Sequence, residues 1–160
     1  MLSGETPPIR LAAAAEADEI ALVINQAFKR AESFFIERDR ISAEEVARLL
    51  QKGAFLVVEH RARLAGCVYV ETRGDRGYFG LLAVRPAEQR RGLARTLIAA
   101  AEDYCRAAGC RLLEIRVVNL RAELPPVYRA LGYRKTGTAP FTAGISTKMP
   151  CHFIVMAKEL

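Results

Sequence analysis

The residues best suited to chemistry form a short basic turn, Gln89-Arg90-Arg91-Gly92-Leu93-Ala94-Arg95. It follows the apolar run Leu81–Val84 and a turn at Pro86, so we expect it to lead from a strand into a helix. The start of a helix has unpaired backbone N–H groups and partial positive charge, which suit a phosphate. Gly92 lets the backbone approach an anion closely. The segment therefore predicts a phosphate-binding site, surrounded by the guanidinium groups of Arg90, Arg91 and Arg95.

Three positions of this turn, Gln89, Gly92 and Ala94, fit a known pattern. They resemble the pyrophosphate-binding signature of the GCN5-related N-acetyltransferase (GNAT) superfamily, Gln/Arg-x-x-Gly-x-Gly/Ala. The resemblance implies that the turn binds the diphosphate of acetyl-coenzyme A (acetyl-CoA), with backbone amides contributing more than side chains. A solvated helix start is the alternative for the arginines. The cofactor-binding residues expected here are Gln89, Arg90, Arg91, Gly92, Leu93, Ala94 and Arg95.

A second segment resembles the other cofactor motif of the same superfamily, Asn-x-x-Ala, then Tyr, then Leu-Gly-Phe/Tyr. This chain has Asn119, Ala122, Tyr128 and Leu131-Gly132-Tyr133, with about two extra residues before the tyrosine. The resemblance implies that Asn119 binds the cofactor and that Tyr128 protonates the departing thiolate as the catalytic acid. The alternatives are a turn or helix-capping role for Asn119 and a core position for Tyr128.

Transfer of an acetyl group from a thioester to an amine creates a developing oxyanion and releases a proton from the amine. A backbone N–H of the preceding strand, at Leu82, Ala83 or Val84, is expected to bind the oxyanion. The position where many family members carry a glutamate base falls at Tyr78. The remaining candidates for the base, each also readable as a surface charge or structural residue, are Glu71, Glu32, Glu37, Asp39 and His152. The acidic and aromatic segment 32–37 suits a cationic amine, or else it is a helix end with buried Phe34 and Phe35.

The elements that must position these groups follow from periodicity and turn chemistry. Strands are predicted at 9–12, 54–59, 64–72, 78–84, 111–118, 133–138 and 152–158, and helices at 16–31, 42–52, 92–108 and from about 125 to before 132. The order β-α-α-β-β-β-α-β-α-β-β predicts an α/β fold. We expect a single GNAT-like domain over residues 1–160, with a mixed, mostly antiparallel twisted sheet flanked by helices.

Composition narrows the class of protein. The 160 residues are 51% hydrophobic and carry a net charge of +6, which suggests an anionic ligand or a solvated basic surface. No basic tail or arginine–aromatic interleaving is present, which argues against nucleic acid. Four scattered cysteines and two histidines argue against a metal site and fit reduced thiols in a cytoplasmic protein. No transmembrane span or signal peptide is expected.

Together these observations predict an acetyl-CoA-dependent N-acetyltransferase without a metal, acting on a small-molecule or peptide amine by direct attack in a ternary complex. The alternative is a non-catalytic module of the same fold that binds or senses acyl-CoA, which the absence of a carboxylate at Tyr78 favours. A basic protein that binds nucleic acid is a third and weaker reading. The acceptor amine is left open, and a homodimer through the last strands is a further hypothesis.

Overall fold

The computed structural model describes residues 8–36, 38–141 and 146–160. Its strands form one seven-stranded sheet in the order β1-β2-β3-β4-β5-β7-β6, antiparallel except between β4 and β5. The strands are β1 (Ile9–Leu11), β2 (Ala54–His60), β3 (Arg63–Arg73), β4 (Arg76–Val84), β5 (Leu112–Val118), β6 (Arg134–Pro140) and β7 (His152–Glu159). The helices are α1 (Ala17–Glu32), α2 (Ala43–Lys52), α3 (Leu93–Ala107) and α4 (Leu124–Ala130), with short 3-10 turns η1 (Ala14–Glu16) and η2 (Pro86–Glu88). The predicted fold class and element order are confirmed.

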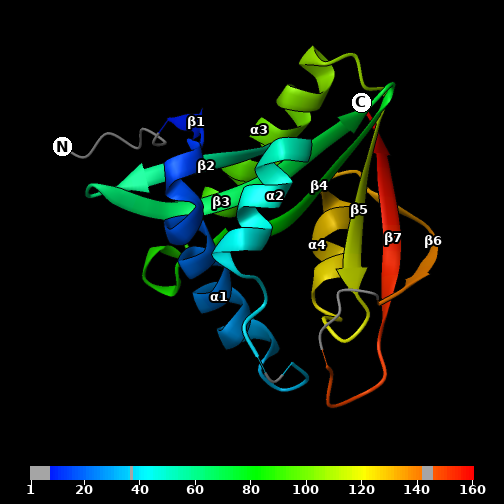
Figure 1. The fold of residues 1–160 in the computed structure, drawn as a ribbon. Coiled ribbons are helices and arrows are strands. Elements are labelled where there is room, and N and C mark those ends of the chain that lie inside the picture. Colours follow the sequence, from blue (N-terminus) through cyan, green and yellow to red (C-terminus); the bar gives the residue numbers. More distant parts are fainter. Residues whose placement is uncertain (1–7, 37, 142–145) are drawn as a thin grey trace.

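Helices cover both faces of the sheet (Figure 1). On one face, α1 buries the stripe Ile20, Val23 and Ile24, whose helical spacing predicted this contact. On the other face, α3 buries Leu97 and Ile98 against β2, β3 and β4. Each helix thus shields one side of the strand that precedes the basic turn. Within the described ranges no helix has the length and apolar character needed to cross a membrane.

Strands β4 and β5 share only three residue pairs, from Arg76–Leu112 to Tyr78–Glu114. Beyond these pairs β5 continues along β7 while β4 remains on β3, and Figure 1 shows the two strands diverging. A bulge lies where β4 moves away, because Leu81 and Leu82 together stand opposite Val68 of β3. Leu81 has a left-handed φ of 52°, which is uncommon for a side chain of this size. The bulge and the divergence leave one edge of β4 without a strand partner after Tyr78.

The end of β4 is tied to α1 by a buried arginine. The side chain of Arg85 donates from Nε to Leu64 O and from Nη1 to Gln26 Oε1 over 3.0 Å. Its Nη2 lies 3.6 Å from Glu19 Oε2. Because a buried guanidinium is costly unless it is paired and hydrogen-bonded, these contacts stabilise the position of the strand end. The sequence analysis did not find this residue.

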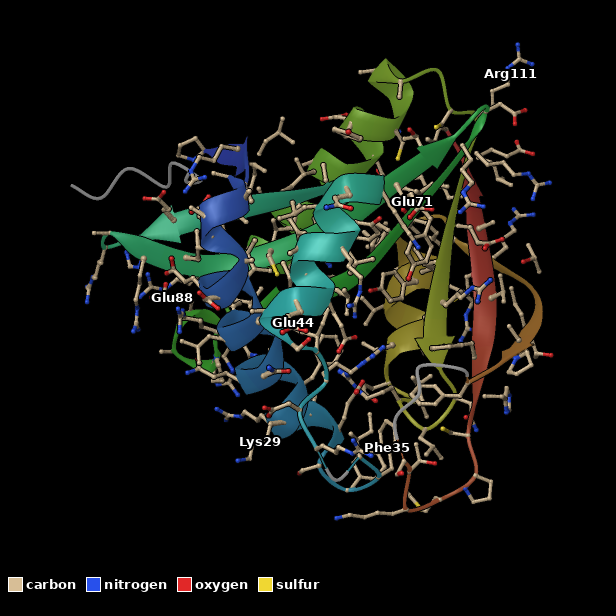
Figure 2. The ribbon with its side chains drawn as sticks, viewed as in Figure 1. Lys29, Phe35, Glu44, Glu71, Glu88 and Arg111 are labelled. Carbon is tan, nitrogen blue, oxygen red and sulfur yellow. The ribbon has the colours of Figure 1, made fainter. Side chains whose placement is uncertain are left out.

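A small apolar cluster closes the lower part of the molecule, where Figure 2 labels Phe35. Phe35 and Ile36 are buried with Val118. The backbone of the same segment meets the loop before β7 through an Ile36–Thr147 bridge and a 2.8 Å bond from Lys148 N to Phe35 O. Two phenylalanines were candidates for burial at the helix end. Phe35 is buried, whereas Phe34 is half exposed.

Candidate active site

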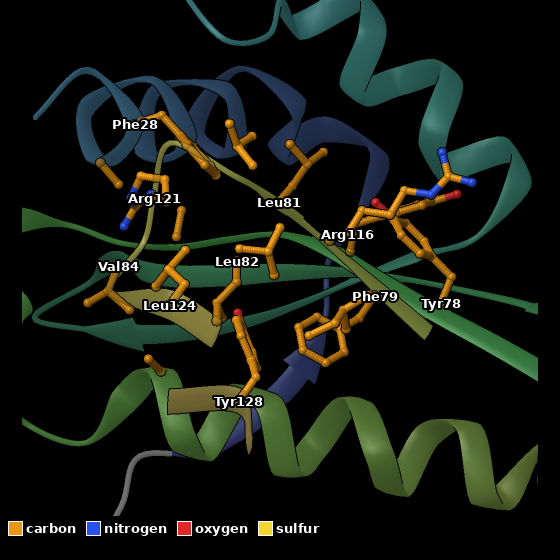
Figure 3. Close-up of a pocket in the computed structure, with 18 of the residues that line it drawn as sticks. Phe28, Tyr78, Phe79, Leu81, Leu82, Val84, Arg116, Arg121, Leu124 and Tyr128 are labelled. Carbon is orange, nitrogen blue, oxygen red and sulfur yellow. The ribbon is translucent and has the colours of Figure 1, made fainter. Parts of the chain in front are cut away.

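A cleft of about 1090 Å³ lies where β4 and β5 separate (Figure 3). Its walls come from α1, β4, β5, α4 and the first turn of α3, so segments far apart in the sequence meet in it. One part, here called the turn end, is formed by residues 88–90 and 92–95. Another part, here called the α1 end, is formed by Phe28, Glu32, Arg40 and Arg121.

At the turn end the backbone has the shape that an anion requires. Arg90 and Gly92 both have a left-handed φ, 68° and 77°. Thr96 N–H donates to Gly92 O over 3.1 Å as the helix begins, which leaves the amides of residues 93–95 without a partner inside the helix. A Cβ added to Gly92 would meet no atom within 4 Å, so the space in front of the turn is open. Alternating left-handed residues and free amides form a concave group of donors suited to phosphate.

The side chains of the predicted phosphate residues divide into two groups. Arg90 and Arg95 line the cleft, as do Leu93 and Ala94. Gln89 also borders the cleft, but its Nε2 donates to Val84 O over 3.1 Å and so fastens the turn to the end of β4.

Arg91 does not line the cleft. It lies 3.5 Å from Glu88 Oε2 and 3.4 Å from the His60 ring. His60 Nδ1 also lies 2.8 Å from Glu88 Oε2, and this contact lowers the pKa of the Glu88 carboxyl. Arg91 therefore belongs to a surface ion-pair group behind the turn.

The unpaired edge of β4 offers backbone donors to the cleft. Arg85 N–H donates to Ala65 O of β3 over 2.8 Å. Because N–H groups alternate along a strand, those of Val84 and Leu82 point to the side that β5 has left, and that of Ala83 points to β3. Of the three residues predicted to bind an oxyanion, Leu82 and Val84 therefore have the better-placed amides, although all three line the cleft.

Tyr128 lies in α4 with 8% of its surface exposed and packs against Phe79 and Tyr133. Its hydroxyl points toward Leu82 and Leu124 (Figure 3). The two prolines that lengthen the second motif occupy the first turn of α4, where proline is tolerated, so the insertion does not remove Tyr128 from the cleft. Burial raises the pKa of the Tyr128 hydroxyl to about 12, so it keeps its proton at neutral pH.

Asn119 is engaged in a structural contact. Its Oδ1 accepts from His152 N over 2.8 Å, and its own N–H donates to His152 O over 2.9 Å. The pair joins the end of β5 to the start of β7, and neither residue lines the cleft. The structure therefore places Asn119 in the turn role that the sequence left open, and it places His152 on the surface.

The candidate bases differ in their surroundings. Glu71 lines the cleft, but Tyr69 donates to its Oε1 over 2.7 Å and Arg73 Nε lies 3.3 Å from its Oε2. Figure 2 shows Glu71 far from Glu88, near the opposite end of the sheet. Asp39 is exposed, and Glu37 lies outside the described residues.

Glu32, one of the candidate bases, is 3% exposed and lines the α1 end of the cleft. The alternative reading of Glu32 as a surface charge is wrong, because α1 continues to Glu32 and the segment after β5 covers it. Arg121 Nη1 lies 3.3 Å from its Oε2. Nothing in the sequence identifies Arg121 as the partner of Glu32, since the two residues are 89 positions apart.

The sequence of residues 13–158 matches the family model described as acetyltransferase (GNAT) domain. The chain belongs to the GNAT family. Among curated protein sequences, none matches this GNAT chain at a significant level. In the described residues, no three histidine, cysteine, aspartate or glutamate side chains gather in a group that could hold a metal ion.

Solved structures share the GNAT fold. A ribosomal-protein-alanine N-acetyltransferase from Brucella melitensis has a TM-score of 0.76 at 19% identity and covers 96% of this chain and 99% of its own. A putative acetyltransferase from Salmonella typhimurium, solved with its cofactor acetyl-CoA, has a TM-score of 0.73 at 21% identity, covering 98% and 95%. The PaiA N-acetyltransferase from Thermoplasma acidophilum, solved with coenzyme A, has a TM-score of 0.76 at 16% identity, covering 98% and 100%. At these identities the likeness concerns the fold.

Proposed function

We propose that this protein transfers the acetyl group of acetyl-CoA to a primary amine by direct attack within a ternary complex. The observation that carries the proposal is the arrangement of one cleft. A helix N-terminus shaped for phosphate lies at the turn end, and the Tyr128 hydroxyl and the free edge of β4 lie beyond it. Family membership supports the same activity, and two of the structural neighbours were solved with acetyl-CoA or coenzyme A.

The residues present fit this donor. The amides of residues 93–95, together with Arg90 and Arg95, would hold the diphosphate, and the open space before Gly92 leaves room for it. The N–H groups of Leu82 and Val84 would bind the oxygen that becomes negative as the amine attacks. Tyr128 would donate its proton to the sulfur as the carbon–sulfur bond breaks. Holding both reactants in one cleft supplies a large share of the rate enhancement.

A module that binds or senses acyl-CoA without turnover is the second candidate function. The observation that favours it is Tyr78, which stands on β4 where many relatives carry a carboxylate. Its ring lies over Gly80, where an added Cβ would come within 2.2 Å of the Tyr78 hydroxyl. The position of Tyr128 in the cleft favours the enzyme, because a sensor has no need of a proton donor there.

The acceptor is a small molecule or a peptide that presents an amine. The α1 end of the cleft mixes an aromatic ring, a carboxylate and two guanidinium groups, which suits a small polar molecule or a chain end. Structural neighbours of this chain are named for different acceptors, a ribosomal protein and phosphinothricin among them, so the comparisons leave the acceptor open.

The test is calorimetric titration with acetyl-CoA, followed by release of free thiol with a panel of primary amines. Gly92→Glu places a side chain and a negative charge in the phosphate space, and we expect the affinity to fall at least about 100-fold. Gly109→Glu is the matched control, because Gly109 also has a left-handed φ (88°) with open space around it but lies at the other end of α3. Tight binding without turnover of any amine would favour the sensing module, and absence of binding by the wild type would refute both.

A further inference from the structure

The last residue of α1, Glu32, has a carboxylate oxygen that no group of the described protein satisfies. The residue is 3% exposed, and its Oε2 lies 3.3 Å from Arg121 Nη1. Its Oε1 is buried and has no hydrogen-bond partner among the described residues. Leaving a buried polar group unpaired costs free energy, so such a group calls for a partner outside the protein or for a role in a reaction.

Glu32 stands between two cavities. It lines the large cleft and also a neighbouring cavity of about 430 Å³, and Phe28 and Arg40 line both as well. Arg40 lies 5.7 Å from the centre of the Phe28 ring, and Figure 3 shows Phe28 and Arg121 at the same end of the cleft. Glu32 therefore borders both cavities, while its Oε1 is itself buried.

The charged groups around Glu32 only partly neutralise it. Arg121, from the segment after β5, also binds Glu123 through Nε over 2.9 Å, so its charge is shared between two carboxylates. Arg40 approaches from the segment before α2. The neighbouring cavity adds four charged side chains from α1 and the adjoining loops: Lys29, Arg38, Asp39 and Lys148. Burial raises the pKa of the Glu32 carboxyl above its ordinary value, against the opposing effect of Arg40 and Arg121.

We infer that Glu32 is the catalytic residue of the acceptor side: its Oε1 binds the ammonium group of the acceptor and accepts a proton from that nitrogen during transfer. This inference rests on the proposed function. Before attack, Glu32 takes one proton from the ammonium group, which leaves a neutral amine with a free lone pair. That nitrogen then attacks the acetyl carbon, the N–C bond forms and the C–S bond breaks. The second proton of the nitrogen passes to water, from which Tyr128 regains the proton that it donates to the sulfur. The thiolate receives its proton from Tyr128, so the two ends of the cleft exchange protons with different reactants.

The other carboxylates are less suited to this role. Both oxygens of Glu71 already have partners in Tyr69 and Arg73. The Glu123 side chain is 63% exposed, and it does not line the cleft. A desolvated carboxylate with a raised pKa is a better base than either, since its proton affinity is closer to that of the amine it must deprotonate.

The first test measures binding without turnover. Full-length protein labelled with ¹³C at the glutamate carboxyl carbons is titrated with benzylammonium chloride, and with benzyl alcohol as the neutral control. Loss of one resonance in Glu32→Gln assigns Glu32. We expect a saturable shift of that resonance with the ammonium ion and none with the alcohol. A Glu32 resonance that ignores benzylammonium at millimolar concentrations would overturn the inference.

The second test measures turnover with the most reactive amine of the panel. Glu32→Gln should lower kcat/KM at least about 10²-fold and remove the acidic limb of the pH profile, and Glu32→Asp should recover part of both. Glu123→Gln is the matched control, because it removes the other partner of Arg121, and we expect it to remain within about threefold of wild type. An acidic limb that persists in Glu32→Gln would also overturn the inference.

Calorimetry separates failure of this inference from failure of the proposed function. The affinity for acetyl-CoA should be unchanged in Glu32→Gln, because Glu32 lies at the α1 end. If wild type does not bind acetyl-CoA, the proposed function fails whatever the Glu32 resonance shows. If wild type binds and acetylates amines while Glu32→Gln does so equally well, the function stands and the role of Glu32 is refuted.

Discussion

The two ends of the cleft are built by different means. The turn end consists mainly of backbone amides within one continuous segment, residues 88–95, whose shape depends on two left-handed residues. The α1 end consists of side chains from α1, the segment before α2 and the segment after β5. A site made of local backbone groups can be predicted from a short sequence motif. A site made of distant side chains can be predicted only when the tertiary fold is known. The comparison predicts that the turn end tolerates loss of single side chains and that the α1 end does not.

The largest expected effect concerns Arg85, the residue that links the end of β4 to α1. Arg85→Met removes the contacts between the end of β4 and α1, and leaves Leu64 O and Gln26 without their donor. We expect the free energy of unfolding to fall by about 3 kcal/mol or more in urea titrations. Arg106→Met, a surface ion-pair variant on α3, should change it by less than about 0.5 kcal/mol. Equal stability of the two variants would mean that the contacts of Arg85 contribute little to the free energy of unfolding.

Tyr128→Phe should affect chemistry and leave donor binding intact. Turnover should fall roughly 10²-fold at neutral pH, because the hydroxyl that protonates the sulfur is lost. The calorimetric affinity for acetyl-CoA should remain within about threefold of wild type. With a pKa of about 12, Tyr128 itself should produce no step in the rate between about pH 6 and 9. Turnover equal to wild type across that range would remove Tyr128 from the mechanism.

Arg90→Gly tests whether backbone or side chain binds the phosphate. Glycine adopts the left-handed φ of 68° without the strain that a side chain adds, so stability should rise by up to about 1 kcal/mol. The amides of residues 93–95 remain, so the affinity for acetyl-CoA should fall less than about fivefold, and mainly at low salt. A loss as large as that of Gly92→Glu would show that the side chain dominates the turn end.

The smallest expected effect concerns the pH dependence of the free energy of unfolding, to which two carboxylates should contribute with opposite signs. The contact with His60 lowers the pKa of the Glu88 carboxyl. The stability that the ionised Glu88 contributes is therefore present above its unfolded-state pKa, and it is lost as the pH falls through its folded-state pKa. Burial raises the pKa of Glu32, so stability decreases as pH rises through its folded pKa.

Two variants check these signs by urea unfolding between about pH 3 and 8. Relative to wild type, Glu88→Gln should become less stable as pH rises, and Glu32→Gln should become more stable. Shifts of the same sign in both variants would contradict the assigned environments of the two carboxylates.

The sequence predicted the elements well because their signals are local. The Ile20, Val23 and Ile24 stripe marks α1, and Ser42 caps α2 by accepting from Glu45 N over 3.1 Å. The turn around Gly92 was predicted for the same reason. The Arg121–Glu32 contact was not, because it joins residues 89 positions apart, and burial of Glu32 depends on which segment covers the end of α1. The structural role of Arg85 was not predicted, because its partners lie on β3 and α1 and belong to no sequence motif.

The short pairing of β4 with β5 has a consequence for aggregation. Where the two strands part, each presents a row of unpaired peptide groups, and such rows on other proteins recruit strands from neighbouring molecules. Here they lie inside the sheet, with α1 on one face and α3 and α4 on the other, instead of at its outer border. Because α1, α3 and α4 cover this region, we expect a second sheet to be unable to reach these peptide groups. Their position inside the sheet would therefore protect these unpaired groups from pairing with other copies of the chain, and would leave them free for the donor of the proposed reaction.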